Sequence, residues 1–154
     1  MIEKIPELVE RYNKIIGENH MSLTSMQYIE AKLGVKFSSI FKNLNNKSSY
    51  AAFSWGLFNP YSENHQSVIG ATKILREYLN LPHKAVILNE GSRTMTIMET
   101  SEDASNEKIY VIILEDVKCY IANEPFQYDY QYFPSFIDFF EFLLIEEEKI
   151  MAEV

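Results

Sequence analysis

The stretch from Ala85 to Leu114, AVILNEGSRTMTIMETSEDASNEKIYVIIL, decides the fold of this chain. Its apolar residues gather in three short runs of β-type sequence, at 85–88, 95–99 and 109–114. Polar residues typical of turns separate the runs, at 89–92 and 101–106. Connections this short favour antiparallel neighbours, because a crossover between parallel strands needs a dozen residues or more. The sequence therefore predicts three consecutive strands of an antiparallel sheet.

Two more segments have the composition of strands. Tyr50 to Phe58 is rich in aromatic residues and ends at Asn59-Pro60. In the second segment, Val117, Cys119 and Ile121 alternate with two other residues, which is the period of a half-buried strand. We therefore expect a twisted, largely antiparallel sheet of four to six strands.

Helical periodicity surrounds these strands on both sides. Apolar residues recur at spacings of three and four, with capping residues at the ends, in five segments: 2–16, 25–33, 38–44, 66–79 and 134–150. Gly17 and Gly34 follow the first two segments, where a residue in the left-handed conformation commonly ends a helix. Helices first, then a run of strands, then a helix is the order of an α+β domain. We expect one such domain over residues 1–154, with helices at its N-terminus, middle and C-terminus.

The composition indicates a globular protein of a reducing compartment. The chain has 154 residues, 47% of them hydrophobic, and a length of this order fits one domain. Its single cysteine, Cys119, has no partner for an internal disulfide, which favours a cytoplasmic location. No stretch approaches the ~20 apolar residues of a membrane span, and the first residues lack the apolar run of a secretory signal. We expect no membrane association.

Acidic charge is concentrated towards the C-terminus. The formal net charge is −8, made up of +3 in residues 1–98, −6 in 99–133 and −5 in 134–154. Such a balance opposes direct nucleic-acid binding, which depends on Lys and Arg that neutralise phosphates. It permits a basic partner, drawn in by long-range attraction.

No motif of known enzyme chemistry is present. The chain lacks phosphate-binding glycine loops, the nucleophile elbow and the zinc-protease motif, and its three histidines, His20, His65 and His83, have no metal-ligand spacing. The alternation around Cys119 places its thiol on the apolar face of a strand, where it is expected to be structural. The adjacent pairs Glu102-Asp103 and Glu115-Asp116 point to opposite faces of a strand and form no dyad. We expect no catalytic activity, no metal and no cofactor.

An unusual aromatic segment lies between Pro125 and Pro134, with the sequence PFQYDYQYFP. Its aromatic residues alternate with polar ones, so an extended chain would present Phe126, Tyr128, Tyr130 and Tyr132 on one side. These rings either cap the sheet or cover the last helix, with their hydroxyls in water, or they form a binding surface. Base stacking is a third use, which the surrounding negative charge opposes. Trp55 is interpreted as a packing residue.

The order of these features resembles the SUKH superfamily in its Smi–Knr type. The helical motifs that carry the resemblance are Ile29–Val35 (IEAKLGV), Thr72–Arg76 (TKILR) and Phe136–Phe140 (FIDFF). The strand motifs are Phe53–Leu57 (FSWGL) and, after Leu81-Pro82, Ala85–Leu88 (AVIL). Together they span roughly residues 25–145. The resemblance implies a binding protein without general catalytic residues, because many bacterial members neutralise a cognate toxin, often a nuclease or another nucleic-acid-modifying enzyme.

The sequence and the resemblance together predict a cytoplasmic immunity protein, a monomer or weak homodimer, that occludes a basic toxin of nuclease type. An acidic surface would accelerate association with the basic cleft of such a partner. The expected contact residues are Glu99, Glu102, Asp103, Glu115, Asp116, Glu124, Tyr128, Asp129 and Tyr130. One alternative is a regulatory interaction module of cell-wall or signalling type. Another is a small-molecule-binding domain or enzyme, which would need a deep pocket around His83 or Cys119.

Overall fold

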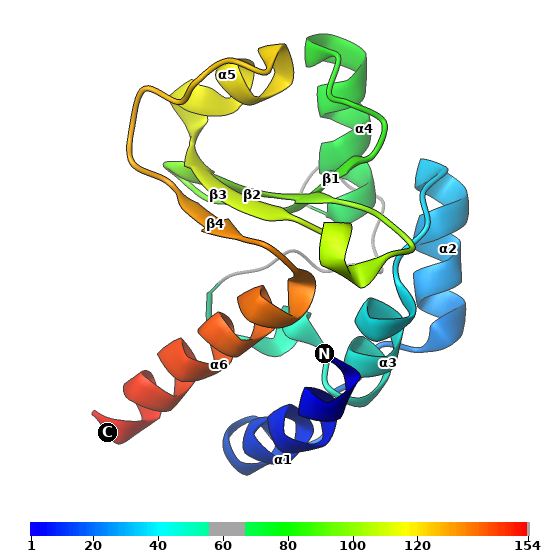
Figure 1. Ribbon diagram of the computed structural model, residues 1–154, viewed down its shortest axis with the longest axis vertical. Coiled ribbons are helices and arrows are strands. Elements are labelled where there is room, and N and C mark those ends of the chain that lie inside the picture. The colour runs from blue at the N-terminus through cyan, green and yellow to red at the C-terminus, as the bar shows by residue number, and fades with distance from the viewer. Residues whose placement is uncertain (56–66, 154) are drawn as a thin grey trace.

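A four-stranded sheet lies between helices in the computed structural model, which describes residues 1–55 and 67–153 (Figure 1). The helices are α1 (Ile5–Ile15), α2 (Leu23–Leu33), α3 (Ser39–Lys47), α4 (Val68–Leu79), α5 (Val117–Ala122) and α6 (Phe136–Ala152). The strands are β1 (Ala85–Glu90), β2 (Thr94–Glu99), β3 (Ile109–Ile113) and β4 (Gln131–Phe133). Short 3-10 turns lie at Ile2–Lys4, Tyr50–Ala52, Ala104–Asn106 and Leu114–Asp116. The expected α+β class is confirmed.

The strands follow one another in the order β1-β2-β3-β4, and every neighbouring pair is antiparallel. Each of the three runs in the stretch from Ala85 to Leu114 forms one strand, as predicted. Helix α4 covers the outer edge of β1, where the Thr72 hydroxyl of α4 accepts the Ile87 N–H of β1 at 2.9 Å. The opposite edge belongs to β4, which is short, as edge strands of natural sheets often are.

The helix ends are set by side-chain caps close to where the sequence predicts them. Ser22, Ser38, Ser67 and Ser135 each accept a first-turn amide, so α2, α3, α4 and α6 begin directly after a serine. Gly34 ends α2 with φ +67°, as expected. The third helix is longer than predicted, since α3 continues to Lys47 instead of ending at residue 44. Among the described residues, no helix has both the length and the apolar character required to span a membrane.

An aromatic core joins α1, α3 and α6 below the sheet (Figure 1). Its rings pack at centroid distances of 4.3–6.4 Å and come from Tyr12, Phe37, Phe41, Tyr50, Phe53, Phe136, Phe139 and Phe140. Trp55 lies against α6 with its ring 6.0 Å from Phe139 and 5.5 Å from Phe142, so its interpretation as a packing residue is confirmed.

The strand predicted at Tyr50 to Phe58 is wrong for the residues that the structure describes. Residues 50–52 form a 3-10 turn and 53–55 are irregular, whereas 56–58 lie outside the described residues. The Asn45 side chain accepts the Tyr50 N–H at 2.9 Å, and this bond turns the chain inward. The aromatic residues of this segment therefore enter the core from a turn. Their high frequency reflects core packing and not the pairing of a strand with its neighbour.

The strand predicted at Val117 to Ile121 is also wrong, because these residues form α5. Val117, Tyr120 and Ile121 are spaced three and four apart, so the same five residues fit one face of a helix as well as a strand. Asn123 ends the helix in the left-handed conformation with φ +56°. A run this short does not distinguish the two periods, and the tertiary packing decides between them.

Candidate functional site

The segment between α5 and β4 is held in place by a buried carboxylate. Asp116 is fully buried and accepts the backbone N–H groups of Gln127 at 2.9 Å and of Tyr128 at 3.0 Å. The segment then enters β4, where Tyr132 pairs with Tyr110 of β3. These contacts give the tyrosine-rich stretch a defined conformation beside the sheet.

An aromatic cluster covers this end of β3 and β4. Tyr110 lies at its centre, with ring centroids 5.6 Å from Tyr120, 6.1 Å from Phe126 and 5.2 Å from Tyr132. Tyr130 packs on Phe126 at 4.6 Å. Three of the four aromatic residues expected on one side of the segment therefore cap the sheet. Tyr128 has no ring contact of this kind among the described residues.

A pocket of about 320 Å³ opens next to the aromatic cluster, between α5 and the start of β1. Glu99 lies in it with only 15% of its side chain exposed. The Tyr120 hydroxyl donates to Glu99 Oε2 at 2.8 Å, and Lys84 Nζ lies 3.6 Å from Glu99 Oε1. The full lining is Pro82, Lys84, Glu99, Tyr110, Tyr120, Ile121, Asn123, Glu124 and Phe126.

The two tyrosine hydroxyls of the pocket, on Tyr110 and Tyr120, are protonated at neutral pH. Burial raises the pKa of Tyr120 well above its ordinary value, and the adjacent Glu99 carboxylate raises it further. Burial, followed by the charge of Glu99, also raises the pKa of Tyr110. Such phenols stay protonated at neutral pH, so the pocket presents carboxylates, hydroxyl donors and aromatic faces, a set suited to binding.

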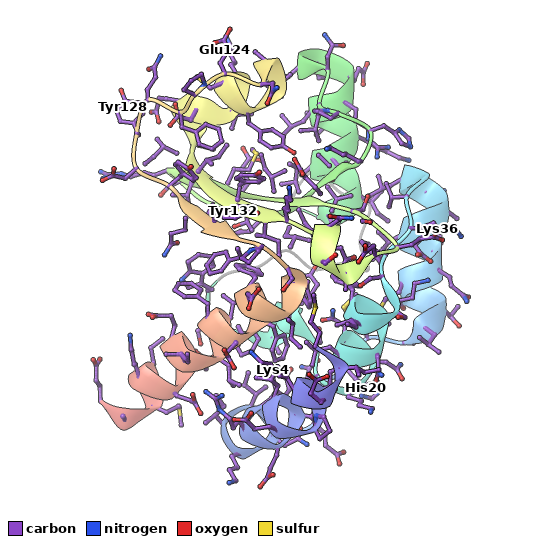
Figure 2. The ribbon with its side chains drawn as sticks, in the orientation of Figure 1. Lys4, His20, Lys36, Glu124, Tyr128 and Tyr132 are labelled. Atoms are coloured by element: carbon purple, nitrogen blue, oxygen red, sulfur yellow. The ribbon has the colours of Figure 1, made fainter. Side chains whose placement is uncertain are left out.

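Outside the pocket, the tyrosine segment presents exposed side chains. Tyr128, Tyr130 and Tyr132 are 53%, 51% and 44% exposed. Figure 2 shows Glu124 beside α5, Tyr128 at the outer bend of the segment and Tyr132 on β4, whereas Lys4 lies at the other end of the molecule. The pocket lining, with Tyr128, Asp129, Tyr130 and Tyr132, is called the tyrosine edge below.

The structure brings together only part of the predicted contact set. Glu99 and Glu124 line the pocket. Asp129 and Tyr130 line a second hollow of about 190 Å³, with Thr94 and Ile113 at the other end of β3, and Tyr128 lies at the bend of the segment (Figure 2). Glu102 and Asp103 lie on the hairpin between β2 and β3, and Glu115 follows the other end of β3. The five residues of β3 separate these two ends by about 13 Å, at ~3.3 Å per residue.

Asp116 is a correction to that set, because its side chain is fully buried and binds two amides of its own chain. It is unavailable to a partner. Asp103 is exposed, but it also serves its own loop, where it accepts the Ser105 N–H at 3.0 Å and caps a 3-10 turn.

Much of the acidic charge of the C-terminal third is used inside the protein. Glu107 and Glu147 are buried and accept backbone amides from distant segments, at Ser38 and Ser54. Glu148 is held by Arg11 of α1 at 2.6 Å, and these hydrogen bonds lower the pKa of Glu148. The expected acidic field is therefore weaker at the surface than the sequence suggests, and the tyrosine edge retains part of it.

His83 and Cys119 have structural surroundings. His83 Nε2 lies 2.9 Å from the Gly34 carbonyl oxygen, and His65 is outside the described residues. Cys119 is buried as expected, although on α5, and burial raises its thiol pKa, which disfavours the nucleophilic thiolate. Neither His83 nor Cys119 lines the pocket beside them. Over residues 1–55 and 67–153, no group of three or more potential ligands is arranged to hold a metal ion.

The residues that the sequence analysis missed are Lys84, Tyr110 and Tyr120. The sequence pattern places Tyr110 and Tyr120 on two separate strands, and nothing in it singles out Lys84. No local pattern links them, because Glu99 and Tyr120 are 21 positions apart and meet only when α5 folds back over the sheet. Comparison with known proteins adds no relative: no protein-family model matches the chain, and no curated protein matches it.

Proposed function

We propose that the protein binds a basic protein partner through the tyrosine edge and acts by covering it, without chemistry of its own. The observation that carries this proposal is the group of exposed tyrosines around Asp129, of which Tyr130 and Tyr132 pack on Phe126 and Tyr110. Phe126 and Tyr110 line the pocket that holds the carboxylates Glu99 and Glu124. Tyrosine is enriched among the residues that dominate binding energy at protein interfaces. Exposed apolar rings next to acidic groups favour a partner with a positively charged surface.

The resemblance to the SUKH superfamily makes the proposal more specific. Many bacterial members of that superfamily neutralise a cognate toxin, often of nuclease type, and we propose the same role for this protein, in the cytoplasm. A nuclease needs a basic cleft to hold phosphates, and an acidic, aromatic surface is complementary to such a cleft. An interface of standard size, about 800 Å² on each partner, is larger than the pocket alone and would extend over Tyr128 and Tyr130.

The test begins with affinity capture from the source organism, followed by purification of the captured partner. The double variant Tyr128→Ala/Asp129→Lys removes one exposed anchor and reverses one charge, and neither side chain supports the fold. We expect its affinity to fall by about 30-fold or more, because an interface anchor contributes about 2 kcal/mol. Isothermal titration calorimetry measures this change.

A matched control is present on α4, where Glu77 and Tyr78 are an adjacent acidic residue and tyrosine, and Tyr78 is 73% exposed. The control variant Tyr78→Ala/Glu77→Lys should bind as the wild type does. The proposal also requires that a stoichiometric amount of the protein blocks the activity of the partner. Equal affinities for both double variants, or an acidic partner that remains active in the complex, would contradict it.

A further inference from the structure

We infer that the pocket of the tyrosine edge receives one arginine side chain of the partner, an inference that rests on the function proposed above. The pocket holds an incompletely satisfied carboxylate, a second carboxylate at its rim and several aromatic walls. A guanidinium group matches each of these features, because it donates to carboxylates in a planar fork and stacks on aromatic faces.

The net negative charge of the pocket lining favours the binding of one cation. Glu99 and Glu124 contribute two negative charges and Lys84 contributes one positive charge, so the lining keeps one net negative charge. The Lys84 ammonium lies 3.6 Å from Glu99 Oε1, which is longer than a hydrogen bond, and the Lys84 side chain is 62% exposed. Lys84 is therefore a weak intramolecular partner that an incoming guanidinium can displace from Glu99.

Glu99 is oriented for such a donor. The Tyr120 hydroxyl holds Glu99 Oε2 at 2.8 Å, which leaves Oε1 directed towards Lys84. Because Glu99 is mostly buried, water screens its charge less than it screens an exposed carboxylate. A hydrogen bond from a guanidinium to this oxygen is of the strong, charge-assisted kind.

The size and walls of the pocket fit a single side chain. Its volume, about 320 Å³, lies at the lower end of the range of about 300–1,000 Å³ for ligand pockets. Tyr110, Tyr120 and Phe126 supply the aromatic faces, against which the guanidinium plane or the arginine methylenes can pack. An anion would meet two carboxylates, so the pocket selects against phosphate groups.

The test uses Nα-acetyl-L-arginine amide, which carries the side chain of an in-chain arginine without free terminal charges. The neutral, isosteric Nα-acetyl-L-citrulline amide is its control. Each is titrated into the full chain labelled with ¹³C in the tyrosine rings, and the tyrosine NMR signals are followed. We expect saturable shifts of Tyr110 and Tyr120 with the arginine compound and none with the citrulline compound.

The variant Glu99→Gln keeps an acceptor for the Tyr120 hydroxyl and removes the charge. It should weaken arginine-amide binding by about tenfold or more, as the loss of one charge-assisted hydrogen bond predicts. The matched variant Glu102→Gln removes an exposed carboxylate from the hairpin outside the pocket and should bind like the wild type. Equal binding of both compounds, or equal effects of both variants, overturns the inference. If these shifts are absent while the Tyr128→Ala/Asp129→Lys variant still weakens partner binding, the arginine pocket is wrong and the proposed function stands.

Discussion

At the residue scale, buried carboxylates act as acceptors for backbone segments that are far away in sequence. Glu107 is fully buried on the hairpin between β2 and β3, where it accepts the Ser38 N–H at 2.9 Å and the Ser38 hydroxyl at 2.5 Å. Burial raises the pKa of Glu107 to about 7, although the Ser38 donors and Lys42 oppose this shift. Glu107 is therefore a buried carboxyl group that titrates near neutral pH.

The raised pKa of Glu107 makes stability depend on pH. Between pH 4.5, the ordinary pKa of a glutamate, and about pH 7, the folded protein holds the proton of Glu107 more tightly than the unfolded chain does. The contribution of Glu107 to stability therefore falls as the pH rises through this range. The total change is about 3 kcal/mol, at 1.36 kcal/mol per pKa unit. Urea unfolding from pH 4.5 to 8 should show this loss for the wild type relative to Glu107→Gln.

The control for this measurement is Glu102→Gln, which removes an exposed carboxylate from the same hairpin. Its free energy of unfolding should follow the wild-type pH profile. A Glu107→Gln variant whose profile runs parallel to that of the wild type over the whole range would show that Glu107 does not titrate as described.

Asp116 has the same role for the tyrosine edge, since it accepts the amides of Gln127 and Tyr128. Asp116→Ala leaves both amides without this acceptor and should destabilise the protein by about 2–6 kcal/mol, at about 1–3 kcal/mol for each of the two unsatisfied groups. Asp116→Asn keeps one acceptor oxygen and should lose less. Hydrogen exchange at the two amides gives a direct measurement, and unchanged protection in Asp116→Ala would contradict the assignment.

At the element scale, helix ends were the most predictable features, because their signals are local. Gly34 and Asn80 end α2 and α4 with φ of +67° and +58°, and these are residue types that tolerate the left-handed region. Asn123 ends α5 in the same way, with φ +56°, in a segment where the sequence predicts a strand. Strands β1, β2 and β3 were predictable for the same reason, since each is bounded by its own turn residues. Strands are wrongly predicted for the described residues 50–55 and for 117–121, because these segments carry apolar patterns that only distant packing partners resolve.

Gly34 allows a test of the idea that the residue at a helix end determines where the helix stops. A Cβ at Gly34 would lie 3.0 Å from His83 Nε2, and its positive φ disfavours alanine. In a His83→Ala background, which removes the crowding ring, Gly34→Ala should still cost about 1 kcal/mol because of the backbone conformation. Gly34→Asn should cost less in the same background. Equal losses for the two substitutions in urea unfolding would show that the backbone conformation is not the cause.

At the scale of the whole molecule, the acidic C-terminal third has two uses. One part is internal, where Glu107, Asp116 and Glu147 connect distant segments of the chain. The other part lies on the surface, where Glu124 and Asp129 accompany the exposed tyrosines. Sequence could identify the tyrosine segment because its alternation is local. It could not separate buried from exposed carboxylates, because burial depends on which amide each one meets after folding.

The most direct test of the proposed binding surface is amide hydrogen exchange of the protein, alone and in complex with its purified partner. The proposal predicts added protection in residues 117–133, which include α5 and the part of the tyrosine edge that follows it, with little change in α1 and the C-terminal half of α6. Protection confined to α1, α2 or α6, with residues 117–133 exchanging as in the free protein, would contradict the proposal.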